Sequence, residues 1–285
     1  MEREPDISAL LRIVASNRGG RGVSLLSRAS HWERALALCV GAEKALIVTG
    51  FFIPSARAPE TDGPPGAVIL GRALARLGKD AALATDSRNF SVLSACSRSV
   101  EGPPVLRMDD ADPFALDGLD LLVFLERPGR ALDGRYYNMR GLDVTPDIAP
   151  LDDLAPAAIE RGISVLGIGD GGNEAGMGFA REELTELLPR YAPFLSCVPS
   201  TVCLAADVSN WGGYALAALL SACAGQWVGV TEEEETRMLR AVFERGAVDG
   251  VFGRPGLSVD GFSLPRLAQV TARIEDWYQL ERNTA

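Results

Sequence analysis

Short apolar runs alternate along this chain with segments of helical periodicity, and this alternation constrains the fold more than any other feature. The predicted strands are Ala45–Thr49, Ala81–Thr85, Leu121–Leu125, Ser164–Ile168 and Val202–Val208. The predicted helices are Ser30–Val40, Gly66–Leu77, Arg181–Leu188, Trp211–Cys223 and Glu232–Arg245. Strands that alternate with helices form parallel pairs, because the crossover between two parallel strands is usually a helix. We therefore expect an α/β fold in three layers, a mostly parallel sheet flanked by helices, built as a single domain over residues 1–285.

Helix starts and turns have local sequence signals. Ser30 and Glu33 have the spacing of a capping box, and the EEEE run at 232–235 places acids in a first turn, where the helix dipole favours them. The tripeptide VDG occurs at Val248–Gly250 and again at Val259–Gly261, and its composition is typical of turns. Its acids, Asp249 and Asp260, fit turns better than ligands, although both could reach the edge where the strands end.

The composition excludes several classes of protein. The chain has 285 residues, 47% of them hydrophobic, which is enough for a large buried core. Its formal net charge of −10 opposes extended contact with nucleic acid, whose affinity depends on clustered Lys and Arg. The apolar stretch Tyr214–Gly225 is too short to cross a bilayer, and the first residues lack the order of a signal peptide. We therefore expect a cytoplasmic protein that binds neither nucleic acid nor a membrane.

Acidic residues follow the predicted strands at the points where the strands end. They are Glu60, Asp62, Asp86, Glu126, Asp170 and Glu174. Two connecting loops, 54–65 and 127–156, are long and rich in Pro and Gly, and such loops are often functional. In an open parallel sheet, ligands bind outside the carboxyl ends of the strands, where these loops would converge. The sequence therefore predicts an acidic site at this edge of the sheet.

The stretch SVLGIGDGGNEAGMGF, residues 164–179, has the spelling G-x-G-x-x-G of a dinucleotide-binding loop. A pyrophosphate would meet the charges of Asp170 and Glu174 there, instead of bare amides at a helix N-terminus. The acid that binds the ribose, expected about twenty residues later, is missing, because the sequence there is PRYAPFL. We therefore expect no NAD at this loop.

The same loop presents Asp170, Asn173 and Glu174, three side chains with oxygen atoms within five residues. Hard cations such as Mg²⁺, Mn²⁺ and Ca²⁺ take oxygen ligands of this kind. A Gly-rich turn whose Asp and Asn bond their own backbone explains the spacing equally well.

Six stretches at the strand ends are unusual in composition and carry a resemblance to a known family. They are TGF at 49–51, ETDGPPGA at 60–67, TD at 85–86, ERPGRALDGRYYNMRG at 126–141, GIGDGGNEAGMG at 167–178 and SNWGGYAL at 209–216. These stretches spread over residues 49–216. In them, and over the surrounding sequence to about residue 260, the chain resembles the C-terminal domain of the D-glutamate cyclase family.

The resemblance implies dehydration of D-glutamate to 5-oxo-D-proline, in which the α-amine attacks the γ-carboxyl group and water leaves. Two positions depart from the family pattern: Phe179 stands where relatives often have a basic or polar residue, and Thr201 stands about where they have an acid. Eukaryotic relatives also have an N-terminal hydro-lyase-like domain, for which we expect no room in this chain. The expected partners are therefore a small acidic amino-acid substrate and either a second copy in a homo-oligomer or a separate hydro-lyase-like protein.

Lactam formation needs a base to uncover the amine, charge stabilisation for the oxyanion and an acid for the departing hydroxide. The single histidine, His31, lies on a predicted helix away from the strand-end loops, so carboxylates are expected to transfer the protons. The candidate catalytic residues are Asp170, Glu174, Glu60 and Asp62. The candidate ligands of a divalent cation, Mg²⁺, Mn²⁺ or Ca²⁺, are Asp170, Asn173, Glu174, Asp86 and Glu126. For Asp62, capping the helix that begins near Gly66 is an equally good interpretation.

An acidic substrate also needs cationic and polar partners. The candidate substrate-binding residues are Arg127, Arg140, Asn138, Asn210 and Trp211. Arg127 and Arg140 belong to a loop with four arginines, and a guanidinium matches the geometry of a carboxylate. Asn210 and Trp211 open a helix, whose first backbone amides are free to hold an anion. Either arginine could instead pair with Glu126, and Trp211 could instead anchor the core.

Three functions are compatible with these residues. The first is a D-glutamate cyclase-like lyase that uses a divalent cation held by carboxylates at the strand ends. The second is another metal-dependent enzyme on the same cluster, such as a phosphate-ester hydrolase. The third is a non-catalytic module that binds a metabolite or a metal and serves a hydro-lyase.

Overall fold

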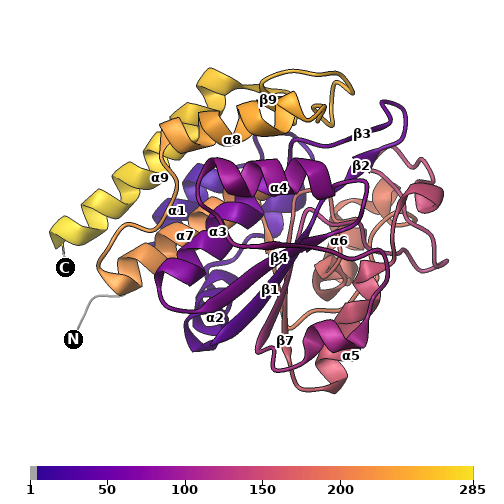
Figure 1. Ribbon diagram of the computed structural model, residues 1–285, viewed down its shortest axis with the longest axis horizontal. Helices are drawn as coiled ribbons and strands as arrows, with labels where there is room; N and C mark the ends of the chain where they lie inside the picture. Colours follow the sequence, from indigo (N-terminus) through magenta and orange to yellow (C-terminus); the bar gives the residue numbers. More distant parts are fainter. Residues whose placement is uncertain (1–4, 285) are drawn as a thin grey trace.

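A six-stranded parallel sheet forms the centre of the computed structural model, which describes residues 5–284 (Figure 1). In sheet order, the strands are β5 (Val105–Arg107), β4 (Asp80–Thr85), β1 (Lys44–Thr49), β6 (Leu121–Leu125), β7 (Ser164–Gly169) and β8 (Val202–Ala205). Two antiparallel pairs lie outside this sheet: β2 (Phe52–Ile53) with β3 (Ala58–Pro59), and β9 (Ser258–Val259) with β10 (Phe262–Ser263). The architecture confirms the α/β fold expected from the alternation of strands and helices.

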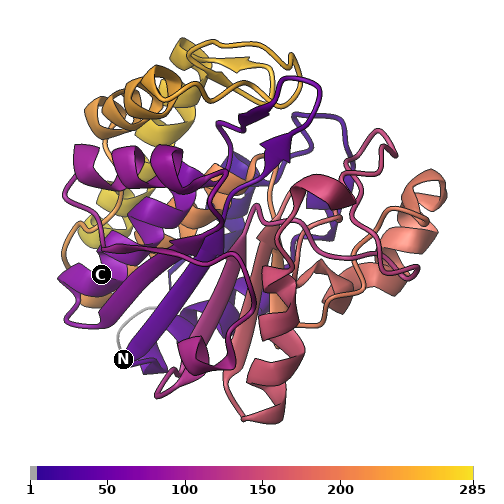
Figure 2. The same ribbon diagram turned by 45° about the vertical axis from the view of Figure 1, so that its right-hand side comes forward.

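Helices lie on both sides of the sheet (Figures 1 and 2). They are α1 (Ile7–Val14), α2 (Ala29–Gly41), α3 (Pro64–Arg76), α4 (Phe90–Ser99), α5 (Leu154–Glu160), α6 (Arg181–Leu187), α7 (Ser209–Ala224), α8 (Glu232–Glu244) and α9 (Leu264–Thr284). On one side, α8 packs on α4 and α9 packs on α7, so an outer layer of helices covers the inner one (Figure 1). Within residues 5–284, no helix has the length and apolar character needed to cross a membrane.

The two faces of the sheet pack into separate apolar cores. The register places Ile47 opposite Val123 and Val123 opposite Leu166, and these side chains belong to the core formed with α3, α7 and α9. Val48 and Phe124, the next residues along β1 and β6, lie in the core formed with α5. Side chains alternate between the faces of a strand, so a strand covered by helices on both sides is apolar at every position. This explains why the strands are uninterrupted apolar runs in the sequence.

The strand order reverses between β1 and β6. Counted along the chain, the strands follow one another across the sheet as third, second, first, fourth, fifth and sixth. The connection after β1 enters α3 on one face of the sheet, and the connection after β6 leads to α5 on the other. In open α/β sheets, ligands bind outside the carboxyl ends of the strands at such a switch point. The fold therefore predicts a ligand site at the loops that follow β1, β6 and β7.

Some boundaries differ from the sequence prediction. The last predicted strand ends at Ala205 instead of Val208. The predicted capping box of Ser30 and Glu33 is wrong: α2 begins at Ala29, so Ser30 already lies inside the helix and Arg28 takes the cap position without a side-chain bond. A capping box is instead present at the start of α8, where Thr231 and Glu234 bond each other's backbone N–H.

Candidate active and metal site

Three carboxylates from three strand-end loops converge outside the switch point. Asp62 lies in the loop after β1, Glu126 directly follows β6 and Asp170 directly follows β7. One carboxylate oxygen of each lies within 4.8 Å of the corresponding oxygens of the other two, and all three residues are buried. We call Asp62, Glu126 and Asp170 the acidic triad. All three were singled out in the sequence by their place after predicted strands.

The starts of α3 and α7 cap each other beside the acidic triad. Asp62 accepts hydrogen bonds from the backbone N–H groups of Ser209, Asn210 and Gly63, each at 2.9 Å. Asn210 in turn accepts from the backbone N–H of Gly63 at 3.0 Å and of Gly66 at 2.8 Å. Asp62 therefore caps α7 and not the nearby helix α3, which is capped by Asn210. The arrangement directs two helix N-termini, which carry partial positive charge, toward the cluster.

Glu126 is held by an unusual backbone conformation. Its φ is 45°, which is uncommon for a residue with a Cβ, and the Ser209 hydroxyl donates to its carboxylate at 2.6 Å. Gly63 makes this possible: it has φ +99°, and a Cβ there would lie 2.9 Å from Cβ of Glu126. Backbone strain of this kind concentrates at functional sites, where the surrounding structure maintains it.

Glu174 shapes the glycine-rich loop after β7. Its carboxylate accepts hydrogen bonds from the backbone N–H groups of Asp170 at 3.0 Å, Gly171 at 2.7 Å and Gly172 at 2.7 Å. Gly169 makes room for it, since a Cβ at Gly169 would lie 2.6 Å from the Glu174 carboxylate. The second glycine of the dinucleotide-like spelling, Gly169, thus accommodates a side chain of the loop itself. Glu174 is not among the three carboxylates of the triad.

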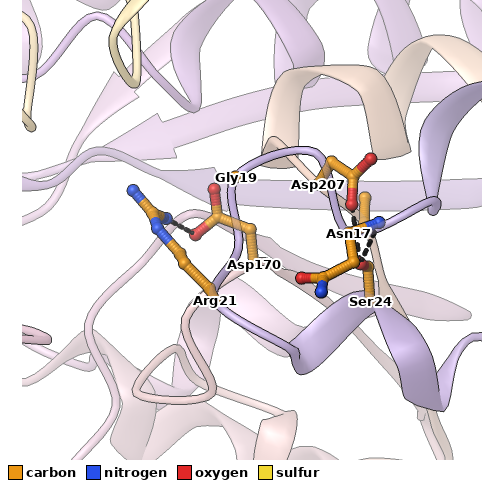
Figure 3. A pocket seen from close by; sticks show the side chains of 7 residues that line it. Asn17, Gly19, Arg21, Ser24, Asp170 and Asp207 are labelled. Atoms are coloured by element: carbon orange, nitrogen blue, oxygen red, sulfur yellow. Dashed lines mark hydrogen bonds and ion pairs between the residues drawn. The ribbon is translucent and has the colours of Figure 1, made fainter.

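Asp170 forms an ion pair with an arginine from the N-terminal part of the chain (Figure 3). Arg21 contacts Asp170 Oδ1, and its second terminal nitrogen lies 3.0 Å from Asp260 Oδ1. Asp170 Oδ2 and Asp260 Oδ2 are buried and have no hydrogen-bond partner within residues 5–284. Arg21 was missed in the sequence, because it follows no strand and only the fold brings it to this edge.

Two further acids complete this region. Glu60 is buried, and its carboxylate lies so close to Gly250 that a Cβ at Gly250 would overlap it. Asp249 accepts hydrogen bonds from the backbone N–H groups of Val251 at 2.9 Å and of Gly261 at 2.9 Å, and thereby joins the two VDG turns. Asp249 therefore organises turns, as expected, whereas Asp260 of the second turn contacts Arg21.

The electrostatics of the cluster disfavour ionised carboxyl groups. Burial, followed by the charge of Asp260, raises the pKa of Asp62 to about 7, although three backbone N–H groups act in the opposite direction. Burial is also the main cause that raises the pKa values of Glu60, Glu126 and Asp170 well above the ordinary range, and like-charged neighbours add to it. Arg21 opposes this rise at Asp170. A bound cation would relieve the repulsion, because positive charge favours the ionised form.

Asp86 and Arg127 pair with each other. Arg127 is completely buried, its Nη1 lies 2.5 Å from Asp86 Oδ2, and it also donates to the carbonyl oxygens of Gly50 at 3.2 Å and Ala149 at 2.6 Å. Asp86 also accepts hydrogen bonds from Asn89 at the start of α4. The expected ion pair of Arg127 with Glu126 is not formed, and Arg127 pairs with Asp86 instead. These contacts attach the loop after β6 to the sheet.

The other candidate residues have local contacts. Arg140 is exposed and donates to the carbonyl oxygen of Val251 at 2.6 Å. Asn138 accepts hydrogen bonds from backbone N–H groups in its own turn, and Asn173 donates to the carbonyl oxygen of Tyr137 at 2.8 Å. Trp211 is completely buried, with its ring 5.2 Å from that of Phe262. Of the candidate substrate-binding residues, Asn210 is therefore the one whose contacts adjoin the acidic triad.

Comparisons with known proteins agree with the resemblance noted in the sequence. A family model described as D-glutamate cyclase-like, C-terminal, matches residues 10–275. The human protein described as D-glutamate cyclase, mitochondrial, is 32% identical over 302 residues, which cover 90% of this chain and 49% of that protein. The chain thus spans about half the length of this relative.

Among solved structures, an exopolyphosphatase-related protein from Bacteroides fragilis matches with a TM-score of 0.44 and 10% identity, over 91% of this chain and 62% of that chain. A likeness of this size carries no argument about function. The family match over most of the chain and the 32% identity to the human protein show that this chain belongs to the D-glutamate cyclase-like, C-terminal family.

Proposed function

We propose that the protein is a D-glutamate cyclase-like lyase that dehydrates D-glutamate to 5-oxo-D-proline with the help of a divalent cation, Mg²⁺ or Mn²⁺, held by the acidic triad. Family membership supports the reaction. The observation that carries the proposal for this chain is the triad itself, in which one buried oxygen, Asp170 Oδ2, has no partner within the described residues.

The residues of the triad fit a hard cation. All three offer carboxylate oxygens, which are the ligands that Mg²⁺, Mn²⁺ and Ca²⁺ prefer. Two oxygens on opposite sides of such a cation are about 4–5 Å apart, and the triad oxygens lie within 4.8 Å of one another. Asp62 and Glu126 are already oriented, by the α7 N-terminus and by Ser209. Pre-oriented ligands reduce the ordering needed when the cation binds.

The reaction joins the α-nitrogen of D-glutamate to its γ-carboxyl carbon and releases one oxygen of that carboxyl group as water. Two protons leave the ammonium group, and both end on the departing oxygen. Glu60 is suited to move these protons, since burial and its acidic neighbours raise its pKa. When bound, the cation would supply charge stabilisation for the oxyanion formed by the attack. The N-termini of α3 and α7 add partial positive charge at the same edge.

Product formation tests the proposal directly. Purified protein is incubated with D-glutamate, with Mn²⁺ or with a chelator, and 5-oxoproline is measured by mass spectrometry. We expect product with Mn²⁺ from the wild type, and a loss of at least a hundredfold in Asp170→Asn. Asp153→Asn is the control, because Asp153 is exposed and pairs with Arg130 outside the triad. No product from the wild type under either condition would contradict the proposed reaction.

A non-catalytic role is the second candidate, and one observation favours it. The chain spans 49% of its human relative, so the reaction of that protein could depend on residues outside the shared half. Mn²⁺ binding by the wild type, lost in Asp170→Asn, together with no product would support a module that binds a metal or a metabolite.

A further inference from the structure

Arg21 lies among the acids of the site and balances part of their negative charge. Within residues 5–284, it is the one Lys or Arg that forms an ion pair with Glu60, a triad residue or Asp260. Its neighbours Asp170 and Asp260 each keep one buried oxygen without a partner. Asp170 is 98% buried, so this oxygen is an unpartnered polar atom that points to a ligand absent from the chain itself.

The segment that carries Arg21 is anchored on both sides, and two glycines flank the arginine. Asp207 accepts hydrogen bonds from the backbone N–H of Ser16 at 3.0 Å and from the hydroxyl of Ser24 at 2.6 Å. Between these anchors, Gly20 and Gly22 flank Arg21, and both have positive φ, at 68° and 87°. Figure 3 shows Arg21 reaching Asp170 from this loop, beside a pocket that Asp207 and Ser24 also line.

Part of the Arg21 side chain is exposed, whereas its partner is buried. The side chain of Arg21 is 27% exposed, whereas that of Asp170 is 2% exposed. Arg21 lies on a loop outside the sheet, so it is the partner of this pair that can move away while Asp170 stays in place at the end of β7. A cation that binds the triad would take over the charge of Asp170 and repel Arg21.

The substrate also needs a positive partner. D-glutamate has two carboxylates, and the γ-carboxyl is the one that reacts, which leaves the α-carboxylate to be bound. Five carboxyl groups line this region (Glu60, Asp62, Glu126, Asp170 and Asp260), so an anionic ligand requires a cation in addition to any metal. A guanidinium binds a carboxylate with two parallel hydrogen bonds, and among residues 5–284 Arg21 is the arginine paired with acids of this cluster.

We propose that Arg21 is an exchangeable counter-ion of the acidic triad: a divalent cation displaces it from Asp170, and it then binds the α-carboxylate of the substrate. This inference rests on the proposed function, because it takes the cation and the substrate from there. Arg21 is thus the residue that selects for an α-carboxylate.

The first test measures Mn²⁺ binding by calorimetry without substrate. Charges of +2 and +1 about 6 Å apart weaken binding about tenfold even at the dielectric constant of water. We therefore expect Arg21→Gln to bind Mn²⁺ about tenfold more tightly than the wild type and Arg21→Lys to stay near it. Arg28→Gln is the control, because Arg28 pairs with Glu183 at the surface. Unchanged or weaker Mn²⁺ binding by Arg21→Gln would overturn the inference.

The second test compares kcat/KM for D-glutamate and for D-isoglutamine, whose α-carboxylate is replaced by an amide. We expect the wild type to prefer D-glutamate and Arg21→Gln to lose this preference roughly ten- to hundredfold, mainly through KM, with partial recovery in Arg21→Lys. Equal losses for both substrates would show a structural role and overturn the inference alone. Wild-type protein that binds no Mn²⁺ or converts neither substrate would contradict the proposed function and this inference with it.

Discussion

Glu174 is the candidate residue whose role the fold redefines most sharply, and its replacement gives a quantitative prediction. Its two oxygens accept three backbone N–H groups of its own loop. In Glu174→Gln, an amide NH₂ replaces one oxygen, so at least one buried N–H loses its acceptor in either orientation of the amide. An unsatisfied buried donor costs about 1–3 kcal/mol, and the lost charge weakens the remaining bonds by about 1 kcal/mol.

We therefore expect Glu174→Gln to lower the free energy of unfolding by about 3 kcal/mol. For a chain of this size, each kcal/mol shifts Tm by about 2 °C, so Tm should fall by about 6 °C. The assay is thermal unfolding in EDTA, so that no metal contributes. Glu186→Gln is the matched control, because Glu186 is exposed on α6 and should change stability by less than about 0.5 kcal/mol. An unchanged Tm in EDTA, combined with lost Mn²⁺ binding, would show that Glu174 is a direct ligand of the cation and not a support for the backbone of its loop.

Three other predictions concern the surroundings of the site. The pKa of Asp62 is raised from 3.8 to about 7 on folding, so its contribution to stability is present below pH 4 and is lost as pH rises through 7. Tm in EDTA should therefore fall between pH 4 and pH 7, and Mn²⁺ should raise Tm more at pH 8 than at pH 6. A Tm in EDTA that does not change with pH would argue against a raised pKa at Asp62. Gly63→Ala should lower the free energy of unfolding, measured in urea, by at least about 2 kcal/mol more than Gly78→Ala. Both glycines have positive φ, but only Gly63 lacks room for a Cβ, and equal losses would argue against its close approach to Glu126. Asp86→Asn should cost about 3–5 kcal/mol, because it leaves Arg127 buried and unpaired, without weakening Mn²⁺ binding, and the reverse result would identify Asp86 as a ligand.

The sequence predicted the sheet well because its strands are buried on both faces. Runs such as Leu121–Leu125 are apolar at every position, and their boundaries match the observed strand. The edge strand β5 was missed, since it has three residues and only one side is paired. The long helix α9 was also missed; its apolar positions contact other helices, such as α7 and α1, and it is not a crossover between two strands of the sheet.

For the candidate site, the sequence placed the acids but not their roles. Asp170 and Glu174 lie in one glycine-rich loop with the same local signals, and only the fold shows that Glu174 bonds the backbone of its own loop while Asp170 lies beside Asp62 and Glu126. Arg21 could not be found from spacing, because it is distant in sequence from every strand end and reaches the site through tertiary structure. Ser209 belongs to the stretch SNWGGYAL, but nothing in the sequence indicated that its hydroxyl donates to Glu126.

Anomalous X-ray diffraction from crystals soaked in Mn²⁺ can show whether the acidic triad holds a divalent cation. We predict one strong anomalous peak bonded to oxygens of Asp62, Glu126 and Asp170, with Arg21 moved off Asp170. A peak held by other residues, or no peak with Arg21 still paired to Asp170, would mean that the triad is not the cation site.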